Sequence, residues 1–433
     1  MLKKMNPNLR KIIANTTWLF GEKILQLFLG LFVGVWVARY LGPENFGLYN
    51  YVIAIVSLFG VIANLGLDQI IVRDISRDIS QKDETLGTSF ILRFTASIFS
   101  TFAVILFTFI SDNNDPQVRM LIGIFSLAMS CSRSMEIVEY WFQSQVQSKY
   151  VVVGKNIVYI TINIIKVIAI QLQAPVSVFV LILSLEQILN AIGLVIVYQF
   201  SGSLIKAWRF SYNRVRSLLK DSWPLILANI VIIIYMRIDQ IMLAQISGAA
   251  SVGLYSAAVK ISEMWYFVPI SIINSVYPSV VQGKELGDRI YYGRIQKLFG
   301  VVAIIGYLVA IPVTFLSPFI VTLIYGTEYA ESATVLTIHI WAGLFIGLGV
   351  ARTTWLTTEN LTQFAAATTA LGALVNIILN SLWIETYGGT GAAVATVISQ
   401  IAASYLSGLF FPPTRPIFWR QTKAILLISW LER

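Results

Sequence analysis

The residues best placed to do chemistry are charged side chains that interrupt long apolar stretches of this sequence. Each costs about 2.5–3.5 kcal/mol at the centre of a bilayer, so we do not expect so many to face lipid. They line a water-filled cavity, pair with one another, or extend toward an interface. For the cations as a set we expect a hydrated cavity, while structural pairing between helices is the competing interpretation for any single one. These cations are Arg133, Lys166, Arg237, Lys260 and Arg352.

Carboxylates in the same stretches are candidate sites for coupling transport to a proton or sodium gradient. A carboxylate withdrawn from water is stabilised when it binds a proton or a cation. The candidates are Glu22, Glu136, Asp239 and Glu263. His339, the only histidine, could also titrate near neutral pH, but its position early in an apolar stretch favours a structural role.

Spacing along a helix indicates which of these charges can pair locally. Arg133, Glu136 and Glu139 recur every three residues, so they share one helical face and can pair along it. Lys260 and Glu263 have the same spacing. We expect the charges in these pairs to neutralise each other along the helix.

Two arginines lack such a local partner. Arg237 and Asp239 are two residues apart, which separates them by about 200° on a straight helix, so each must find another partner. Arg352 follows Gly347-Leu-Gly-Val-Ala and has no carboxylate within four residues. We expect Arg352 to bind an anionic ligand or a carboxylate on another helix.

Composition places these residues in a membrane. Hydrophobic residues make up 57% of the chain, charged residues only 12%, and the mean hydropathy is +0.74; soluble domains carry about 25% charge. The sequence therefore predicts an all-α polytopic membrane protein with about twelve transmembrane helices. The predicted spans are about 12–39, 46–71, 86–110, 118–142, 150–171, 176–199, 218–245, 252–281, 298–324, 332–356, 362–385 and 389–411.

An internal repeat divides the chain. Gly42-Pro-Glu-Asn-Phe-Gly-Leu-Tyr49 returns as Gly248-Ala-Ala-Ser-Val-Gly-Leu-Tyr255, an offset of 206 residues. Repeats of this kind predict two pseudo-symmetric six-helix bundles. We place the first bundle at 1–205, a cytoplasmic linker at 206–217, the second bundle at 218–411 and an interfacial cytoplasmic tail at 412–433.

The distribution of Lys and Arg predicts the orientation. Cations concentrate at both ends of the chain and in alternate loops, and the other loops are acidic, so both termini are expected in the cytoplasm. The net charge of +9 follows from this asymmetry; because no basic cluster sits in a soluble domain, we expect no nucleic-acid partner.

Nothing in the sequence predicts catalysis. No connection exceeds about 20 residues, and no phosphate-binding G-x-x-x-x-G-K or metal-binding H-E-x-x-H motif occurs. The single cysteine, Cys131, excludes an internal disulfide and a cysteine metal site, and we expect it to be buried. We expect neither an enzyme nor a bound metal or cofactor.

Several segments together resemble the polysaccharide transporter family of O-antigen and exopolysaccharide flippases, within the multidrug/oligosaccharidyl-lipid/polysaccharide exporter superfamily. The resemblance covers about residues 10–411. The segments that carry it are 38–49, with the sequence Ala-Arg-Tyr-Leu-Gly-Pro-Glu-Asn-Phe-Gly-Leu-Tyr; 237–243; 252–263; 349–352; 376–380; and 387–396.

The resemblance implies a carrier whose central cavity opens alternately to either face of a bacterial inner membrane. Its substrate would be an oligosaccharide repeat unit on undecaprenyl diphosphate, moved from the inner to the outer leaflet. Arg237, Lys260 and Arg352 lie in the matching segments and are the first candidates for diphosphate or sugar contact; Arg133 and Lys166 are selected on charge alone. Further partners would be membrane lipids and a polysaccharide polymerase, and a monomer is expected to suffice.

Two rival functions remain open. A cation-coupled multidrug exporter of the same fold would usually have an acidic cavity for cationic drugs, and the cations here argue against it. A membrane-embedded glycosyl transferase or ligase would normally need a long outer-face loop, which the sequence lacks.

Overall fold

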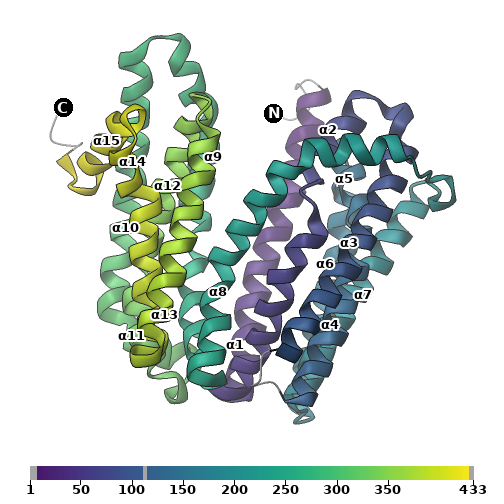
Figure 1. Cartoon of the computed structure of the whole chain (residues 1–433), viewed down its shortest axis with the longest axis horizontal. Helices are drawn as coiled ribbons and strands as arrows, with labels where there is room; N and C mark the ends of the chain where they lie inside the picture. The colour runs from purple at the N-terminus through teal and green to yellow at the C-terminus, as the bar shows by residue number, and fades with distance from the viewer. Residues whose placement is uncertain (1–6, 111–114, 429–433) are drawn as a thin grey trace. The chain divides into compact units, whose positions relative to one another are not determined.

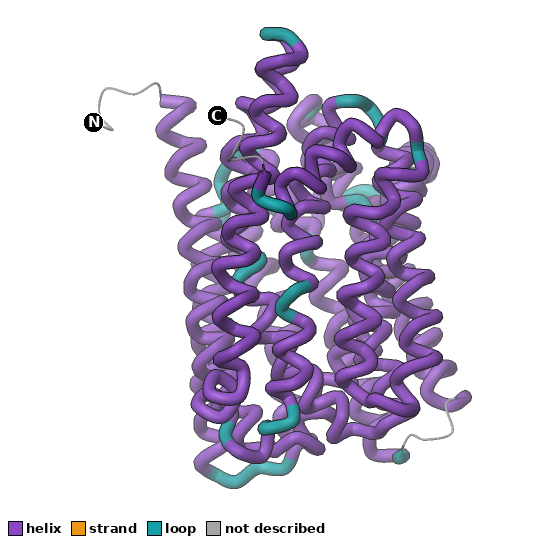
Figure 2. Tube along the Cα trace, turned by 90° about the vertical axis from the view of Figure 1, so that its left-hand side faces the viewer, coloured by secondary structure: helices purple, strands orange, loops and turns teal. Residues whose placement is uncertain are grey.

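The computed structural model describes residues 7–110 and 115–428, and within these ranges the chain is helical with short connections (Figures 1 and 2). The first half contains α1 (Pro7–Asn64), α2 (Asp68–Arg77), α3 (Lys82–Ile110), α4 (Pro116–Met135), α5 (Ile137–Ser144), α6 (Lys149–Gln171) and α7 (Val176–Phe200). The second contains α8 (Tyr212–Met264), α9 (Phe267–Glu285), α10 (Asp288–Tyr325), α11 (Ser332–His339), α12 (Ala342–Thr358), α13 (Thr362–Ile401), a π-helical turn (Ala402–Leu406), α14 (Ser407–Phe410) and α15 (Arg415–Ile425).

The predicted number of spans is confirmed once three long helices are divided at their breaks. The described residues hold nine helical stretches long and apolar enough to cross a membrane. Three of these stretches contain a residue with non-helical backbone angles, at Gly42, Gly248 and Gly388. Counting the segments on either side of each break separately gives twelve spans, as expected for a multi-pass membrane protein.

The two copies of the repeat adopt the same backbone conformation. Gly42 has φ 67° and ψ 172°, and Gly248 has φ 83° and ψ 175°. Residues with a Cβ rarely adopt such positive φ values, so glycine is the residue that allows each helix to stop and restart in another direction. In the first copy Pro43 follows directly and begins the next helical segment.

The chain forms two compact units. The first consists of 1–41 and 51–233, and the second of 42–50 and 234–433. The short segment 42–50, from the middle of α1, thus belongs with the second half of the sequence. The predicted bundle limits at 205 and 218 remain a prediction.

In the first unit, α3 turns polar side chains toward α4 and apolar side chains outward. On α3, the Phe94, Ile98 and Phe102 side chains are exposed, whereas Ser97 and Thr101 are buried. The Thr101 hydroxyl lies 2.9 Å from the Ser130 hydroxyl of α4. This is the polarity of a lipid-facing helix, whose apolar face meets hydrocarbon and whose hydroxyls join it to its neighbour. Cys131 is exposed rather than buried as expected, because the inward face of α4 is taken by Ser130 and the serines a turn away.

In the second unit, α10 packs against α9, α11, α12 and α15, and α13 packs against α11 and α12. The core between them contains aromatic and aliphatic side chains such as Phe299, Leu348 and Trp355. Ile417 and Ala424 of α15 belong to the same core, so the short C-terminal helix is part of this unit.

Candidate functional site

The two copies of the repeat pack against each other inside the second unit. A Cβ atom at Gly47 would collide with the carbonyl of Ala249, and one at Gly253 would collide with the carbonyl of Pro43. The relation is reciprocal, as a two-fold relation between the copies requires. Only glycine lets the two backbones approach so closely.

This packing positions the first predicted substrate cation. The Phe46 ring of the first copy contacts Tyr329 edge-on, with ring centroids 6.2 Å apart. The Lys260 Nζ lies 4.4 Å from the centroid of the same Phe46 ring, a cation–π geometry. Lys260 is therefore held by a residue more than 200 positions earlier in the sequence.

The break at Gly248 places the two halves of α8 side by side and gathers four of the predicted charges. Gln240 before the break donates to the Ser256 hydroxyl after it at 3.3 Å. By the same arrangement Arg237 comes near Glu263, and both Arg237 and Lys260 attract the Glu263 carboxylate. Within residues 7–110 and 115–428, the Arg237 guanidinium makes no hydrogen bond or ion pair. Arg237 is thus a cation whose hydrogen-bonding capacity is available to a ligand.

Asp239 lies in the interior of the second unit, only 5% exposed, and is surrounded by neutral donors. The Tyr255 hydroxyl donates to its Oδ2 at 2.6 Å and the Thr396 hydroxyl to the same oxygen at 2.8 Å. The Asn380 amide donates to Oδ1 at 2.6 Å. Asp239 therefore found partners other than Arg237, as its spacing predicted, but these partners carry no charge.

The amides beside Asp239 have spare capacity. Asn380 also donates to the Asn376 Oδ1 at 3.0 Å, while the buried Asn380 Oδ1 and Asn376 Nδ2 have no partner in the described structure. Carboxylate, amide and hydroxyl oxygens are ligands for hard cations. The arrangement can hold a proton on Asp239 or a small cation between these oxygens, and we call Asp239, Tyr255, Asn376, Asn380 and Thr396 the Asp239 cluster.

Arg352 is buried among neutral groups. Its guanidinium donates to Ser407 Oγ at 2.8 Å, to Thr368 Oγ1 at 3.1 Å and to the Ala403 carbonyl at 2.8 Å. Ala403 lies in the π-helical turn, where the wider turn leaves a carbonyl for a side-chain donor. Arg352 thus joins α12, α13 and α14 without a carboxylate among its bonded partners, and its Nε atom has no partner within the described residues.

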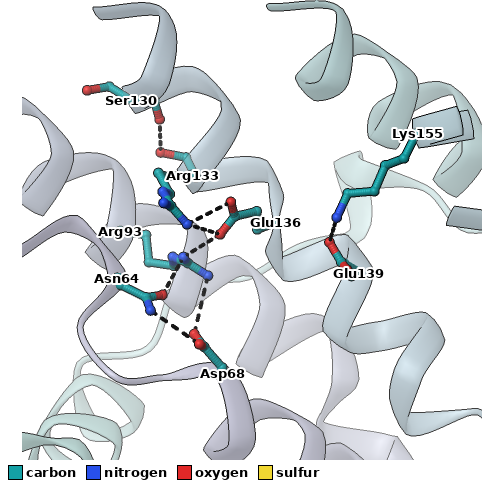
Figure 3. Close-up of polar contacts among 9 residues, drawn as sticks. Asn64, Asp68, Arg93, Ser130, Arg133, Glu136, Glu139 and Lys155 are labelled. Carbon is teal, nitrogen blue, oxygen red and sulfur yellow. Dashed lines mark hydrogen bonds and ion pairs between the residues drawn. The ribbon is translucent and has the colours of Figure 1, made fainter. Parts of the chain in front are cut away.

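The first unit holds a network of paired charges at two helix breaks (Figure 3). Arg93 is fully buried and donates to Asn64 at 2.7 Å and to Glu136 at 2.9 Å, with Asp68 at 3.9 Å. Asn64 ends α1, Asp68 begins α2, and Glu136 separates α4 from α5. We call Asn64, Asp68, Arg93, Arg133 and Glu136 the Arg93 network.

The other predicted residues of the first unit also have partners. Arg133 pairs with Glu136 at 3.1 Å, as their spacing predicted. Glu139 pairs instead with Lys155 of α6 at 2.5 Å, because the helix breaks at Glu136 and the shared face is lost.

Two more predicted residues remain in this unit. Lys166 lies 3.5 Å from Glu186 of α7. Glu22 accepts a hydrogen bond from Gln26 at 3.2 Å. Glu22 also lies close enough to the Lys155–Glu139 pair to interact with both of its charges.

A model of the polysaccharide biosynthesis protein family matches residues 12–284 of the chain. The chain belongs to the polysaccharide biosynthesis protein family. A second family model, MatE, matches residues 224–382.

Two similar proteins are named for the transport or the synthesis of surface polysaccharides. A putative O-antigen transporter of Shigella flexneri is 23% identical over 91% of this chain and 96% of its own length. The capsular polysaccharide biosynthesis protein CapF of Staphylococcus aureus is 22% identical over 90% of this chain and 97% of its own length.

Solved structures show the same fold. The lipid II flippase MurJ in an inward closed conformation has a TM-score of 0.67, 18% identity, and coverage of 97% of this chain and 92% of its own. A multidrug resistance MATE family transporter in an inward-facing conformation has a TM-score of 0.68, 14% identity, and coverage of 92% and 96%. These likenesses confirm the all-α fold built from two bundles.

The sequence predicted a functional role for Asp239 but not for the residues that surround it. Asn376 and Asn380 are four residues apart in an apolar span, so they share one helical face, and this spacing could have indicated a polar site. Tyr255 and Thr396 carried no such signal. They meet Asp239 only because α8 reverses at Gly248 and α13 breaks at Gly388.

Proposed function

We propose that this protein is a flippase that moves an undecaprenyl-diphosphate-linked oligosaccharide from the inner to the outer leaflet of a bacterial inner membrane for surface polysaccharide synthesis. The observation that carries the proposal is the similarity, over 91% of the chain, to a protein named as an O-antigen transporter. The proposal assigns no catalytic step to the protein, and both termini lie in the cytoplasm.

The charges of the second unit support an anionic substrate. Arg237 has guanidinium donors that no described residue uses, and Lys260 lies close by on the other half of α8. A diphosphate would accept charge-assisted hydrogen bonds from both, and the planar guanidinium can bind two phosphate oxygens at once. Glu263 would hold the two cations in place until the substrate arrives.

The Asp239 cluster supports coupling to an ion gradient. A buried carboxylate bonded only by neutral donors gains from a proton or a sodium ion, because either one balances its charge. Binding would draw Asn380 Oδ1 and the Tyr255 hydroxyl toward the cation and so link α8 to α13. We propose that this event drives alternating access of the cavity to the two faces of the membrane.

The test uses cells that lack the gene. Lipid-linked glycan should accumulate and should be protected from an impermeant glycosidase, because it stays on the cytoplasmic face. Expression of the wild-type chain should restore access, and Arg237→Ala should not. Arg216→Ala removes a cation that is exposed on α8 outside the site and should restore access like the wild type.

Two results would contradict the proposal. Accumulation of glycan that the glycosidase can reach would place the defect after transport and indicate a polymerising or ligating enzyme. Intact surface polymer without accumulation would indicate that the chain transports something else. A polysaccharide polymerase is the partner expected to consume the product, and a monomer is expected to suffice.

A cation-coupled multidrug exporter is the second candidate, because the MatE family model matches residues 224–382. The deletion strain would then show normal glycan but a greater sensitivity to cationic drugs. Arg237 and Lys260 argue against it, since a cationic site repels such drugs.

A further inference from the structure

A polar pocket lies between the beginning of α10 and the C-terminal helix α15. It has a volume of about 520 Å³, which is in the range of small-molecule sites. Its walls come from two helices that are more than 100 residues apart in the sequence. The lining residues are Asp288, Arg289, Tyr292, Gly293, Gln296, Trp419, Arg420 and Lys423.

The wall contributed by α15 is fixed by packing. Ile417 and Gln421 on the opposite face of α15 are fully buried. The Gln421 amide donates to the carbonyls of Leu348 and Ser404, at 3.2 Å each. Across the pocket, the Gln296 amide donates to the Arg420 carbonyl at 3.1 Å. The pocket is therefore a built feature of the second unit.

The pocket carries an excess of positive charge. Its lining contains three cations, Arg289, Arg420 and Lys423, against one carboxylate, Asp288. The Arg420 guanidinium lies 4.1 Å from the centroid of the Tyr292 ring, and its Nη1 donates to the Pro416 carbonyl at 2.9 Å. These two contacts fix the guanidinium plane and leave its other N–H donors for a ligand. Arg289 and Arg420 form no ion pair with any residue in 7–110 or 115–428. Burial lowers the pKa of Arg420 below the usual arginine value, so a nearby anion would stabilise its charged form.

The surroundings of the pocket are apolar and exposed. Trp419 and Lys423 are four residues apart and share the outward face of α15, and Leu426 follows directly after the helix. Trp419 is 58% exposed and Leu426 is 61% exposed. Exposed tryptophan, lysine and leucine are typical of a helix at a membrane interface. The distribution of Lys and Arg in the sequence predicts that this end of the helices lies on the cytoplasmic side, where anionic lipids attract basic segments.

We propose that this pocket binds the phosphate headgroup of an anionic phospholipid from the cytoplasmic leaflet, whose acyl chains lie beside Trp419 and Leu426. The headgroup phosphate accepts hydrogen bonds from Arg420 and Arg289, and Lys423 closes the site. Because the two walls come from α10 and α15, the lipid joins the C-terminal helix to the second unit. This site is separate from the one proposed for transport and does not depend on it.

The experiment measures lipid binding to the purified full-length protein in a neutral detergent. Phosphatidylglycerol is added stepwise and its binding is followed by native mass spectrometry and by the melting temperature. The variant Arg420→Gln/Lys423→Gln removes two cations from the pocket. The matched control Arg216→Gln/Lys220→Gln removes an Arg and a Lys from the exposed surface of α8, outside the pocket. Parallel titrations use phosphatidylcholine and inorganic phosphate.

We expect one phosphatidylglycerol to be retained by the wild type and by the control, and to raise their melting temperatures. The pocket variant should bind it about thirtyfold more weakly, the effect expected from losing two cations near a lipid phosphate. Phosphatidylcholine should not substitute.

Equal weakening in the pocket variant and the control would overturn the proposal, because it would show general attraction to the basic surface. Protection by inorganic phosphate alone, at the same concentration, would overturn the assignment to a lipid. If the double variant fails to fold, Arg289→Gln, on the α10 wall, provides the same comparison without altering α15.

Discussion

The Arg93 network gives the sharpest prediction of stability, because a fully buried arginine there joins two helix breaks (Figure 3). The perturbations are Arg93→Met and Glu136→Met, alone and together. Methionine keeps an unbranched apolar side chain in the space of each residue and removes its charge. The change therefore tests the ion pair with little loss of packing.

The magnitudes follow from what each substitution leaves unpaired. Removing one partner of a buried ion pair costs about 3–5 kcal/mol. Without Arg93, Glu136 still has Arg133 at 3.1 Å, so we expect a loss near the lower value, about 3 kcal/mol. Without Glu136, the fully buried Arg93 keeps Asn64 at 2.7 Å, the Tyr140 ring at 5.4 Å and, as its nearest carboxylate, Asp68 at 3.9 Å, so we expect about 5 kcal/mol.

The double variant should be more stable than either single variant. It leaves no buried charge from the pair uncompensated, and replacing both partners of a buried pair by apolar residues is often close to neutral. Arg133 is partly exposed and can turn toward water when Glu136 is absent. A rescue of this kind would not follow if each side chain acted independently.

The assay is thermal unfolding of the purified protein in detergent. For a unit of about 220 residues, a loss of 3 kcal/mol corresponds to a melting temperature lower by roughly 6–12 °C. The control is Arg73→Met, which removes an arginine with equally short ion pairs to Asp74 and Asp221 but with a side chain that is 40% exposed. Exposed ion pairs contribute about 0–1 kcal/mol, so this variant should melt close to the wild type. Equal losses for Arg93→Met and Arg73→Met would refute the reasoning from burial, and a double variant less stable than both singles would refute the pairing.

Three further predictions concern the second unit. Gly47→Ala should prevent accumulation of folded protein, seen by size-exclusion chromatography, because its Cβ would overlap the Ala249 carbonyl; Gly123→Ala, with open space at its Cβ, should behave as the wild type. Asp239→Asn should abolish the dependence of transport on pH or sodium, which is measured in cells by the protection of the glycan from glycosidase. An unchanged dependence would exclude Asp239 as the coupling group. Arg352→Ala should abolish transport and also lower the melting temperature, since it removes buried hydrogen bonds from a charged donor to Ser407 and Thr368, worth about 1.5–3 kcal/mol each. Wild-type transport would remove Arg352 from the candidate substrate contacts.

The sequence by itself determined the class, the number of spans and the repeat. Apolar stretches of about 20 residues can only be helices in a bilayer, because the backbone must satisfy its own hydrogen bonds there. The copies of Gly-x-x-x-x-Gly-Leu-Tyr that begin at Gly42 and Gly248 are enough to indicate the duplication. Local spacing also predicted the Arg133–Glu136 pair, because residues three apart meet on any helix.

Only the tertiary structure decided which charges meet across helices. Helical periodicity predicts neighbours only within one unbroken helix. Because the helix breaks at Glu136, Glu139 pairs with Lys155 rather than with Arg133. Because α8 breaks at Gly248, the Tyr255 hydroxyl can donate to Asp239. Burial also depends on contacts between helices. Arg93 and Arg352 are buried with partners from other helices, whereas Arg237 is more exposed. The residues that flank these three arginines in the sequence do not predict this difference in burial. Pairing of buried charges depends on distance in space, and that distance is set by where helices bend and how they pack.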